Sequence, residues 1–479
     1  MCEIVFRVNQ QKTLDIFSKN IKPDTPSWAI WEREMYKKQL RTIHWITNMQ
    51  RQDGSFWGGY NDDTFILIGY SGIPLMGDEK SKKSFMKLYD GIENAGIYKN
   101  GYCDIWPIDY VHITDFITSR GLLFPYAPGD PHVFEREMVT ARVYKNLMAK
   151  NNAERAKEGL PPFDLSNTNN RTEPKLWGEN TVRDYELTQI HWYWGKTPQP
   201  EPYRLKSREN IAREMMNISN KYDKTEEYKF TKSMRHTDIQ GRAPGRQELI
   251  TAALGGKLPV RIEILPHSIA VSWDNPDPDI ARLVNYADEN EVKLNLYNFN
   301  PEPQKISMRL YRILKGEYQL KVGRDENDDG EIDSETNILR SEKLRLSRFS
   351  NVSFMIPSGE NIAVELKLLR KLKRPEKLPD LAIQPKRDIK QKHDTVKVTV
   401  HNIGDGDAKN ITVTVLDKNE NVLAEKTIQK IKAPIDLVPK MESVTFNLTD
   451  NKWHRIVIDR DKSIEEIYEG NNQAINNLN

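Results

Sequence analysis

The chain has 479 residues, 38% hydrophobic and 29% charged, and this length predicts about three domains of globular protein. Its 71 basic and 69 acidic residues leave a net charge of +2, which gives no indication of a nucleic-acid partner. No apolar run approaches the roughly 20 residues of a membrane helix, so no membrane span is expected. Cys2 and Cys103 are too few for a disulfide framework or a metal site, and no organic cofactor is expected.

The first ten residues, MCEIVFRVNQ, lack the basic head and the apolar stretch of a signal peptide. Two explanations are open. Either the protein is cytoplasmic, or its natural N-terminus is missing here. We favour the second, because the C-terminal part described below indicates an extracellular or cell-surface protein.

Residues 28–150 have the apolar spacing of helices. Apolar side chains recur every three or four residues along the first segment, which predicts one buried helix face: Trp28, Ile30, Trp31, Met35, Leu40, Ile43 and Ile46. A glycine-rich loop follows at 50–61, and a second loop spans 100–107.

These two loop–helix units look like one repeated unit. Asp53 corresponds to Asn100, and Asp62 corresponds to Asp109 at the same offset of 47 residues. A helical-hairpin repeat of this period predicts a partial α/α toroid or solenoid. Such repeats need stacked neighbours, so we expect that earlier hairpins precede this chain and that the toroid-like domain, 1–255, is N-terminally truncated.

Residues 151–245 are polar, and they contain the aromatic cluster His191-Trp192-Tyr193-Trp194. We interpret this cluster as packed core, with a sugar-binding platform as the alternative. Arg242 and Arg246 are candidates for binding a substrate carboxylate in a bidentate manner, and an exposed loop is the alternative.

From residue 256 the apolar period changes to two, which predicts a β-sandwich over 256–372. The alternating segments are 260–265, 293–299, 307–313, 318–322, 352–356 and 363–368. The basic segment 367–377 is predicted to be a solvated tether that leads into a last, all-β unit.

The last unit, 378–479, opens with LPDLA, continues with VKVTVHNIGDGDAKN and closes with HRIVIDRDKSIEEIYEGNN. These motifs resemble the CARDB family (cell adhesion related domain found in bacteria). The resemblance implies an immunoglobulin-like β-sandwich of the kind appended to secreted bacterial and archaeal enzymes and adhesins. Alternating Val396, Val398 and Val400, with Ile456 and Ile458, are expected to pack one face. The segment KAPIDLVPKME lacks the family's usual Pro-x-Gly-Glu turn, which leaves that local turn open.

An acidic, glycine-containing segment at 323–333 places oxygen-bearing side chains at alternate positions, as Ca²⁺ requires. The segment resembles an EF-hand or dockerin loop, although Thr336 stands at its twelfth position and strands flank it. We predict a structural calcium site, with a bare acidic turn as the alternative. Its ligands would be Asp325, Asn327, Asp329, Glu331 and Asp333.

Residues 50–145 resemble toroid-type helical domains of bacterial polysaccharide-degrading proteins, on the motifs GGYNDDT and APGDPHVFEREM. In such enzymes the cleft lies where loops and helix ends meet, which selects five candidate catalytic residues: Asp62, Asp63, Tyr110, His112 and Asp115. Candidate substrate-binding residues are Trp57, Tyr60, Trp106, Arg120 and Arg242. Helix capping by the aspartates, and burial of the histidine and the aromatic rings, are the alternatives.

Our leading hypothesis is a secreted carbohydrate-active protein, specifically a polysaccharide lyase acting on an acidic glycan. A lyase needs a base, here His112 or Tyr110, and a group that neutralises the uronate carboxylate. An inverting glycoside hydrolase that uses Asp62 or Asp63 is one alternative. A non-catalytic surface or adhesion protein is the other. The expected partner is a polysaccharide or a cell-surface glycan.

Overall fold

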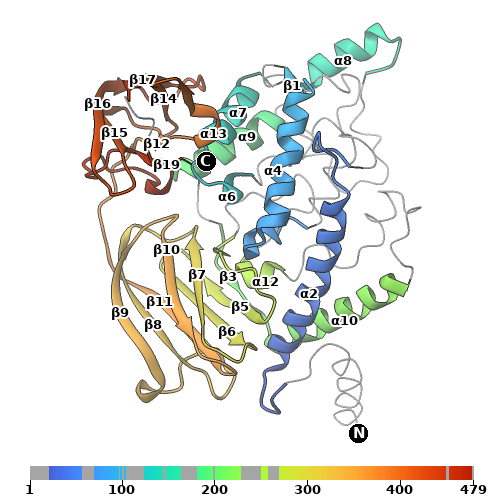
Figure 1. Cartoon of the computed structure of the whole chain (residues 1–479). Coiled ribbons are helices and arrows are strands. Elements are labelled where there is room, and N and C mark those ends of the chain that lie inside the picture. The colour runs from blue at the N-terminus through green and yellow to red at the C-terminus, as the bar shows by residue number, and fades with distance from the viewer. Residues whose placement is uncertain are drawn as a thin grey trace. The chain divides into compact units, whose positions relative to one another are not determined.

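The computed structural model describes residues 21–56, 70–96, 98–99, 102–103, 123–143, 147–162, 181–197, 200–227, 250–256, 269–448 and 453–476. The chain is a multidomain α+β protein, with helices toward its N-terminal side and several antiparallel sheets after residue 270 (Figure 1). None of the helices in these ranges is long and apolar enough to cross a membrane.

The described residues form two compact units. Unit 1 takes those within 1–85, 199–260 and 268–373, and unit 2 takes those within 86–198 and 374–479. Each unit therefore combines helical segments with two larger sheets, and unit 2 also holds the two-stranded sheet of β1 and β2. The division into 1–255, 256–372 and 378–479 predicted from the sequence follows chain order instead, and helix α4 (Glu79–Asn94) runs from one unit into the other.

Unit 1 contains two sheets, with strand orders β10-β7-β4 and β3-β5-β6-β11-β8-β9, and its strand pairs are antiparallel. Its elements, in chain order, are α2 (Ser27–Asn48), η1 (Pro74–Met76), β3 (Tyr203–Arg204), α10 (Arg208–Glu227), α12 (Ile250–Leu254), β4 (Val271–Trp273), β5 (Ile280–Ala287), β6 (Glu291–Asn298), β7 (Gln304–Leu310), β8 (Gly316–Arg324), η6 (Glu335–Asn337), β9 (Ile338–Leu346), β10 (Asn351–Ile356) and β11 (Asn361–Lys371).

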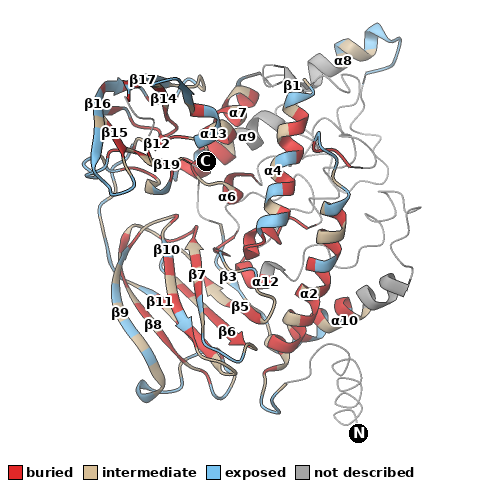
Figure 2. Cartoon of the chain, in the orientation of Figure 1, coloured by how far each residue is buried: buried red, intermediate tan, exposed pale blue. Residues whose placement is uncertain are grey.

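All seven apolar side chains predicted for the first helix are buried in α2, but Glu32, Glu34, Lys38 and Gln39 are buried too, so the burial extends beyond the single predicted face. Trp31 and Met35 share a core with Met215 of α10 and Leu283 of β5, so both helices cover the larger sheet at β5. Strand β9 is the opposite edge of that sheet and alternates between partly exposed and exposed residues (Figure 2).

Unit 2 contains a helical part and a C-terminal pair of sheets. The helical part holds β1 (Tyr98–Lys99), β2 (Tyr102–Cys103), α6 (Leu123–Tyr126), α7 (Pro131–Val143), α8 (Leu147–Lys157) and α9 (Thr181–Trp194). The C-terminal part holds β12 (Leu381–Ala382), α13 (Pro385–Asp388), β13 (Ile389–Lys392), β14 (Thr395–Asn402), β15 (Ala408–Leu416), β16 (Val422–Ile431), β17 (Met441–Asn447), β18 (Arg455–Ile458), η7 (Glu469–Asn471) and β19 (Gln473–Ile475).

The C-terminal sheets form the predicted sandwich. In one sheet β14 pairs with β12, β13 and β17, and the other sheet has the order β16-β15-β18-β19. Val396, Val398 and Val400 are fully buried, as are Ile456 and Ile458, and the facing side chains of both sheets form one core. The alternation of period two is therefore confirmed, because inward residues meet the facing sheet and outward residues meet solvent.

The basic segment 367–377 begins as ordered structure. Strand β11 continues to Lys371 and pairs with β8, and the guanidinium of Arg370 binds Glu317 at 2.6 Å. The prediction of a tether over this whole segment is therefore wrong for its first half. In the segment without the family's usual turn, Leu437 adopts a φ of 57°, and Asp436 accepts a hydrogen bond from the N–H of Val438.

Candidate functional site

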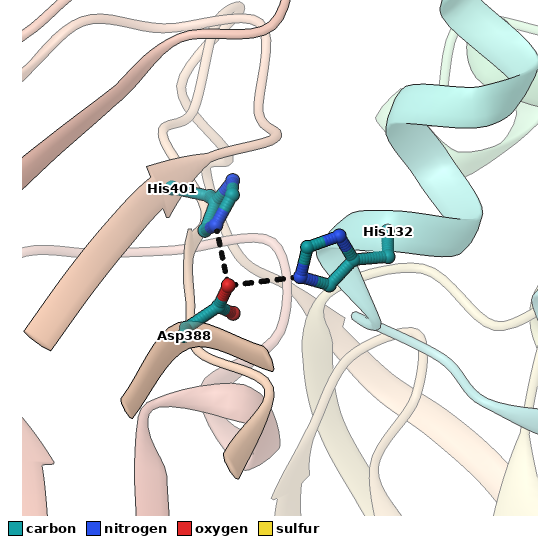
Figure 3. A group of neighbouring side chains, drawn as sticks. All are labelled: His132, Asp388 and His401. Atoms are coloured by element: carbon teal, nitrogen blue, oxygen red, sulfur yellow. Dashed lines mark hydrogen bonds and ion pairs between the residues drawn. The ribbon is translucent and has the colours of Figure 1, made fainter. Parts of the chain in front are cut away.

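Three ionisable side chains meet in unit 2, from segments far apart in sequence. They are His132 of α7, Asp388 at the end of α13 and His401 of β14 (Figure 3). His401 and Asp388 are 1% and 4% exposed, whereas the side chain of His132 is 25% exposed. The cluster is therefore buried on the sandwich side and reachable on the helix side.

The start of α7 orients the first imidazole. Pro131 occupies the first turn, and the carboxylate of Asp130 accepts hydrogen bonds from the N–H groups of His132 (2.9 Å) and Val133 (3.3 Å). These bonds cap the helix, because they satisfy N–H groups that have no partner within it. Glu135 lies three residues after His132, so the two side chains share one helix face.

The short helix α13 holds the carboxylate. The side chain of Gln384 accepts a hydrogen bond from the N–H of Arg387 at 3.0 Å, and Pro385 sets the first turn. The other carboxylate oxygen of Asp388, Oδ2, accepts the N–H of Gln384 at 2.6 Å. His401 is held by strand pairing between Ala382 and Met441. The short helix and the strand pairing thus fix the backbone positions of Asp388 and His401.

The distances within the cluster are short. Nε2 of His132 donates to Oδ1 of Asp388 at 2.8 Å, and Nε2 of His401 lies 3.1 Å from the same oxygen. On its other side, Nδ1 of His401 donates to Oε1 of Glu135 at 2.6 Å. The two imidazole rings stand edge to face, with centroids 5.3 Å apart.

The electrostatics favour positive charge at His401. Burial lowers the pKa of His401, but its contacts with Asp388 and Glu135 outweigh burial and raise that pKa to about 9. For Asp388, burial raises the pKa, whereas the contacts with His132 and His401 dominate and hold it well below its ordinary value. The cluster thus holds a carboxylate that attracts cations.

Two chemical roles fit this arrangement. Among the residues that the structure describes, His132, Asp388 and His401 form the group of histidine and acidic side chains that could hold a metal ion, since their ligand atoms all lie within 4.8 Å of one another. The same contacts also fasten α7 to the sandwich as an ion-pair network. Both roles use the same atoms.

The candidate site predicted from the sequence lies elsewhere. The candidate catalytic and substrate-binding residues all fall outside the described residues, so their predicted convergence stays a prediction. They are Asp62, Asp63, Tyr110, His112, Asp115, Trp57, Tyr60, Trp106, Arg120 and Arg242.

The acidic segment after β8 is a loop of unit 1 that is held mainly by hydrogen bonds between its own residues. Each of the five predicted calcium ligands has a side-chain oxygen that accepts a hydrogen bond or binds a cation within the protein: Asp325 from Gly330 N–H, Asn327 from Asp329 N–H, Asp329 from Glu331 N–H, Asp333 from Glu326 N–H and Glu331 from Lys293.

A guanidinium lies against this loop. Nη1 of Arg208 donates to Oδ1 of Asp328 at 2.6 Å and lies 3.4 Å from Oδ2 of the buried Asp325. Trp28 adds a 3.0 Å hydrogen bond from its indole N–H to Asp328. Arg208 therefore supplies positive charge where the sequence predicts Ca²⁺. The calcium site stays a prediction.

Three of the four residues of the aromatic cluster on α9 are packed core, whereas His191 is exposed. Trp192, Tyr193 and Trp194 are 5%, 1% and 3% exposed, and the indole N–H of Trp194 donates to the carbonyl of Ile403 at 2.8 Å. Rings buried to this degree have no free face for a sugar, so the packing interpretation is confirmed.

His132 and His401 lie within motifs that are recognisable in the sequence, but neither histidine is among the predicted site residues. Two signals were available: a histidine three residues before a glutamate at a helix start, and a histidine in the buried register of a strand. The partner Asp388 could not be foreseen, because 256 residues separate it from His132.

Comparison with known proteins identifies the C-terminal part. The family model CARDB matches residues 378–476. No match was found among curated protein sequences.

Solved structures that match include a β-porphyranase of glycoside hydrolase family 86 from the human gut bacterium Bacteroides plebeius, at 11% identity and a TM-score of 0.13. A β-glucuronidase from Ruminococcus gnavus in complex with D-glucuronic acid matches at 12% identity and a TM-score of 0.13. The matches cover 38% and 36% of this chain and 35% and 34% of those structures, so the chain spans about a third of their length. The assignment of the C-terminal module therefore rests on the family match, which confirms that residues 378–476 of this chain resemble the CARDB family.

Proposed function

We propose that this protein is a secreted carbohydrate-active protein whose CARDB module is an accessory domain. The observation that carries the proposal is the family match over residues 378–476, because such modules are appended to secreted bacterial enzymes and adhesins. The resemblance of residues 50–145 to helical domains of polysaccharide-degrading proteins supports the same class.

The packing of the module supports an accessory role. Its first residues are joined to the helical part of unit 2 by buried polar contacts, including Tyr193 Oη to Asp380 (2.8 Å) and Trp194 Nε1 to the carbonyl of Ile403 (2.8 Å). Lys196 adds an ion pair of 2.7 Å with the buried Asp405. Two buried carboxylates of the module, Asp380 and Asp405, are thus engaged in holding it to the helical part of unit 2.

For the chemistry we propose β-elimination on an acidic glycan. A base, His112 or Tyr110, would remove the proton beside the uronate carboxylate, and Arg120 or Arg242 would neutralise that carboxylate. A hydrolase would instead need two carboxylates on opposite sides of the sugar ring, with Asp62 or Asp63 as one of them.

The test is a product assay with the full chain on a panel of acidic polysaccharides. Elimination leaves a conjugated double bond that absorbs ultraviolet light, whereas hydrolysis releases reducing ends without that absorbance. We expect His112→Ala to abolish the ultraviolet signal while the melting curve stays that of the wild type. Reducing ends without absorbance would replace the lyase by the hydrolase. Binding without any shortening of glycan would overturn the enzyme in favour of an adhesion protein.

A further inference from the structure

We propose that His132, Asp388 and His401 bind a divalent transition-metal ion, with Zn²⁺ as the best fit to this ligand set. The site lies within unit 2, apart from the N-terminal residues of the proposed glycan chemistry, and it does not depend on that proposal.

The spacing of the ligand atoms suits a tetrahedral ion. With metal–nitrogen and metal–oxygen bonds of about 2.0–2.1 Å, neighbouring ligands of tetrahedral Zn²⁺ stand about 3.3 Å apart. Oδ1 of Asp388 lies 2.8 Å from Nε2 of His132 and 3.1 Å from Nε2 of His401, and all three atoms fall within 4.8 Å. Around such an ion, the two distances from Oδ1 would lengthen by a few tenths of an ångström, and the two nitrogens, which lie within 4.8 Å of each other, would stand about 3.3 Å apart.

An independent observation concerns the inner nitrogen of His401. This residue is 1% exposed, and its Nε2 lies 3.1 Å from Asp388 Oδ1, so a buried imidazole nitrogen faces the cluster. A metal ion could take the place of the proton on that nitrogen and keep the contact with the Asp388 carboxylate.

Glu135 supplies the support that metal-binding histidines usually have. Its carboxylate accepts the hydrogen bond from Nδ1 of His401 at 2.6 Å, which leaves Nε2 as the nitrogen that faces the cluster (Figure 3). Carboxylate–histidine–metal arrangements of this kind fix the ring orientation and increase the basicity of the ligand.

The choice of metal follows from the donor atoms. Two imidazoles and one carboxylate suit Zn²⁺ and its neighbours in the transition series, whereas Ca²⁺ and Mg²⁺ prefer oxygen ligands throughout. Three protein ligands leave a fourth position for water, and the partly exposed His132 marks the side from which water and the ion would enter.

The nearby cations do not oppose a metal. Asp90 binds Nη2 of Arg136 at 3.0 Å and Nη2 of Arg387 at 2.7 Å, so the guanidinium groups flanking the site already have a carboxylate partner. A metal ion bound to both Nε2 atoms would displace the proton of His401 Nε2 and the proton that His132 Nε2 donates to Asp388, and the carboxylates of Asp388 and Glu135 would balance its two positive charges.

The experiment uses tag-free full-length protein stripped with a chelator and kept in excess Ca²⁺. Calorimetric titration with Zn²⁺ should give one Zn²⁺ per chain, and Co²⁺ should give the visible absorption of a four-coordinate site with nitrogen ligands. His132→Gln and Asp388→Asn should each weaken Zn²⁺ binding more than tenfold, and Glu135→Gln should weaken it about 10–100-fold.

The matched control is His44→Gln. His44 and Asp78 in unit 1 form a histidine–aspartate pair of 2.8 Å, like that of His132 and Asp388, and His44→Gln should leave Zn²⁺ binding unchanged. Wild-type protein that binds no stoichiometric Zn²⁺ would overturn the proposal, as would His132→Gln and Asp388→Asn variants that bind as the wild type does. If a variant fails to fold by circular dichroism, the Co²⁺ spectrum of the wild type decides: an octahedral, oxygen-only spectrum would reject the site.

Discussion

The hydroxyl of Tyr193 donates a 2.8 Å hydrogen bond to Oδ2 of Asp380, and both side chains are buried. The other carboxylate oxygen accepts Nδ2 of Asn471 at 2.7 Å. One carboxyl group thus connects helix α9 with both ends of the CARDB module. Because it is buried, its partners and its protonation should govern the stability of unit 2.

Tyr193→Phe should lower the free energy of unfolding by about 1–3 kcal/mol, because it leaves a buried carboxyl oxygen without its donor. Denaturant melts followed by tryptophan fluorescence would measure the loss. The matched control is Tyr286→Phe in unit 1, since the Tyr286 hydroxyl also donates to a carboxylate, Asp288, at 2.7 Å but in a partly exposed pair. We expect a smaller loss there, and equal losses would contradict the role of burial.

The stability of unit 2 should fall as pH rises from 5 to 9. Burial raises the pKa of Asp380 to about 8, and burial together with the Asp380 charge raises the pKa of Glu466 to about 9. Between their unfolded values of 3.8 and 4.5 and these folded values, the folded state holds protons that the unfolded state has released. Each such proton makes stability decline by up to about 1.4 kcal/mol per pH unit.

His401 changes stability in the same direction, because its raised pKa stabilises the fold below pH 6.5 and that contribution is lost as pH rises through about 9. The comparison that isolates the carboxyl group is Asp380→Asn, whose amide needs no proton. Thermal melts across this range should show a shallower pH dependence for Asp380→Asn than for the wild type. Parallel curves would contradict the assignment.

Gly404→Ala should destabilise the CARDB module strongly. A Cβ at this position would lie 2.4 Å from the carbonyl oxygen of Leu378 and 2.4 Å from the carbonyl carbon of Pro379, and backbone cannot rotate away as a side chain can. We expect a loss of about 3 kcal/mol or more in thermal or denaturant melts.

The control for that variant is Gly159→Ala, also in unit 2. Gly159 has a φ of +71°, and no described atom lies within 4 Å of the position that a Cβ would take there. Only backbone strain of about 1–2 kcal/mol should therefore appear. If Gly404→Ala melted no lower than Gly159→Ala, close backbone approach would not be the reason for the glycine in this motif.

A prediction for the acidic loop distinguishes the effect of Ca²⁺ on stability from that of the Arg208 guanidinium. If the loop binds Ca²⁺, a chelator should lower the melting temperature of unit 1, Ca²⁺ should restore it, and Asp325→Ala with Asp329→Ala should remove this response. Arg208→Gln should lower the melting temperature with or without Ca²⁺, because it leaves Asp325 and Asp328 without their guanidinium. A melting temperature insensitive to chelator would mean that Arg208 and Lys293 balance the charge of the loop without Ca²⁺.

Local pattern was sufficient to predict several elements. The spacing of Trp28, Trp31 and Met35 predicts a helix face, and the alternation of Val396, Val398 and Val400 predicts a strand face, because each depends on a repeat of the backbone itself. The motifs of the C-terminal module identified its family for the same reason, since its turns and strands are contiguous in sequence. The helical repeat at 50–120 is also a local pattern, but its candidate residues lie outside the described part of the chain.

The tertiary structure alone decided which distant groups meet. His132 and Asp388 are 256 residues apart, and Arg208 reaches Asp328 across 120 residues, so no periodicity relates them. Such contacts arise because burial of the apolar faces of helices and sheets leaves polar groups that must find partners inside. The sequence by itself determined the helix and strand faces and the CARDB module. Packing decided that a histidine of one segment, an aspartate of a second and a histidine of a third share one buried site.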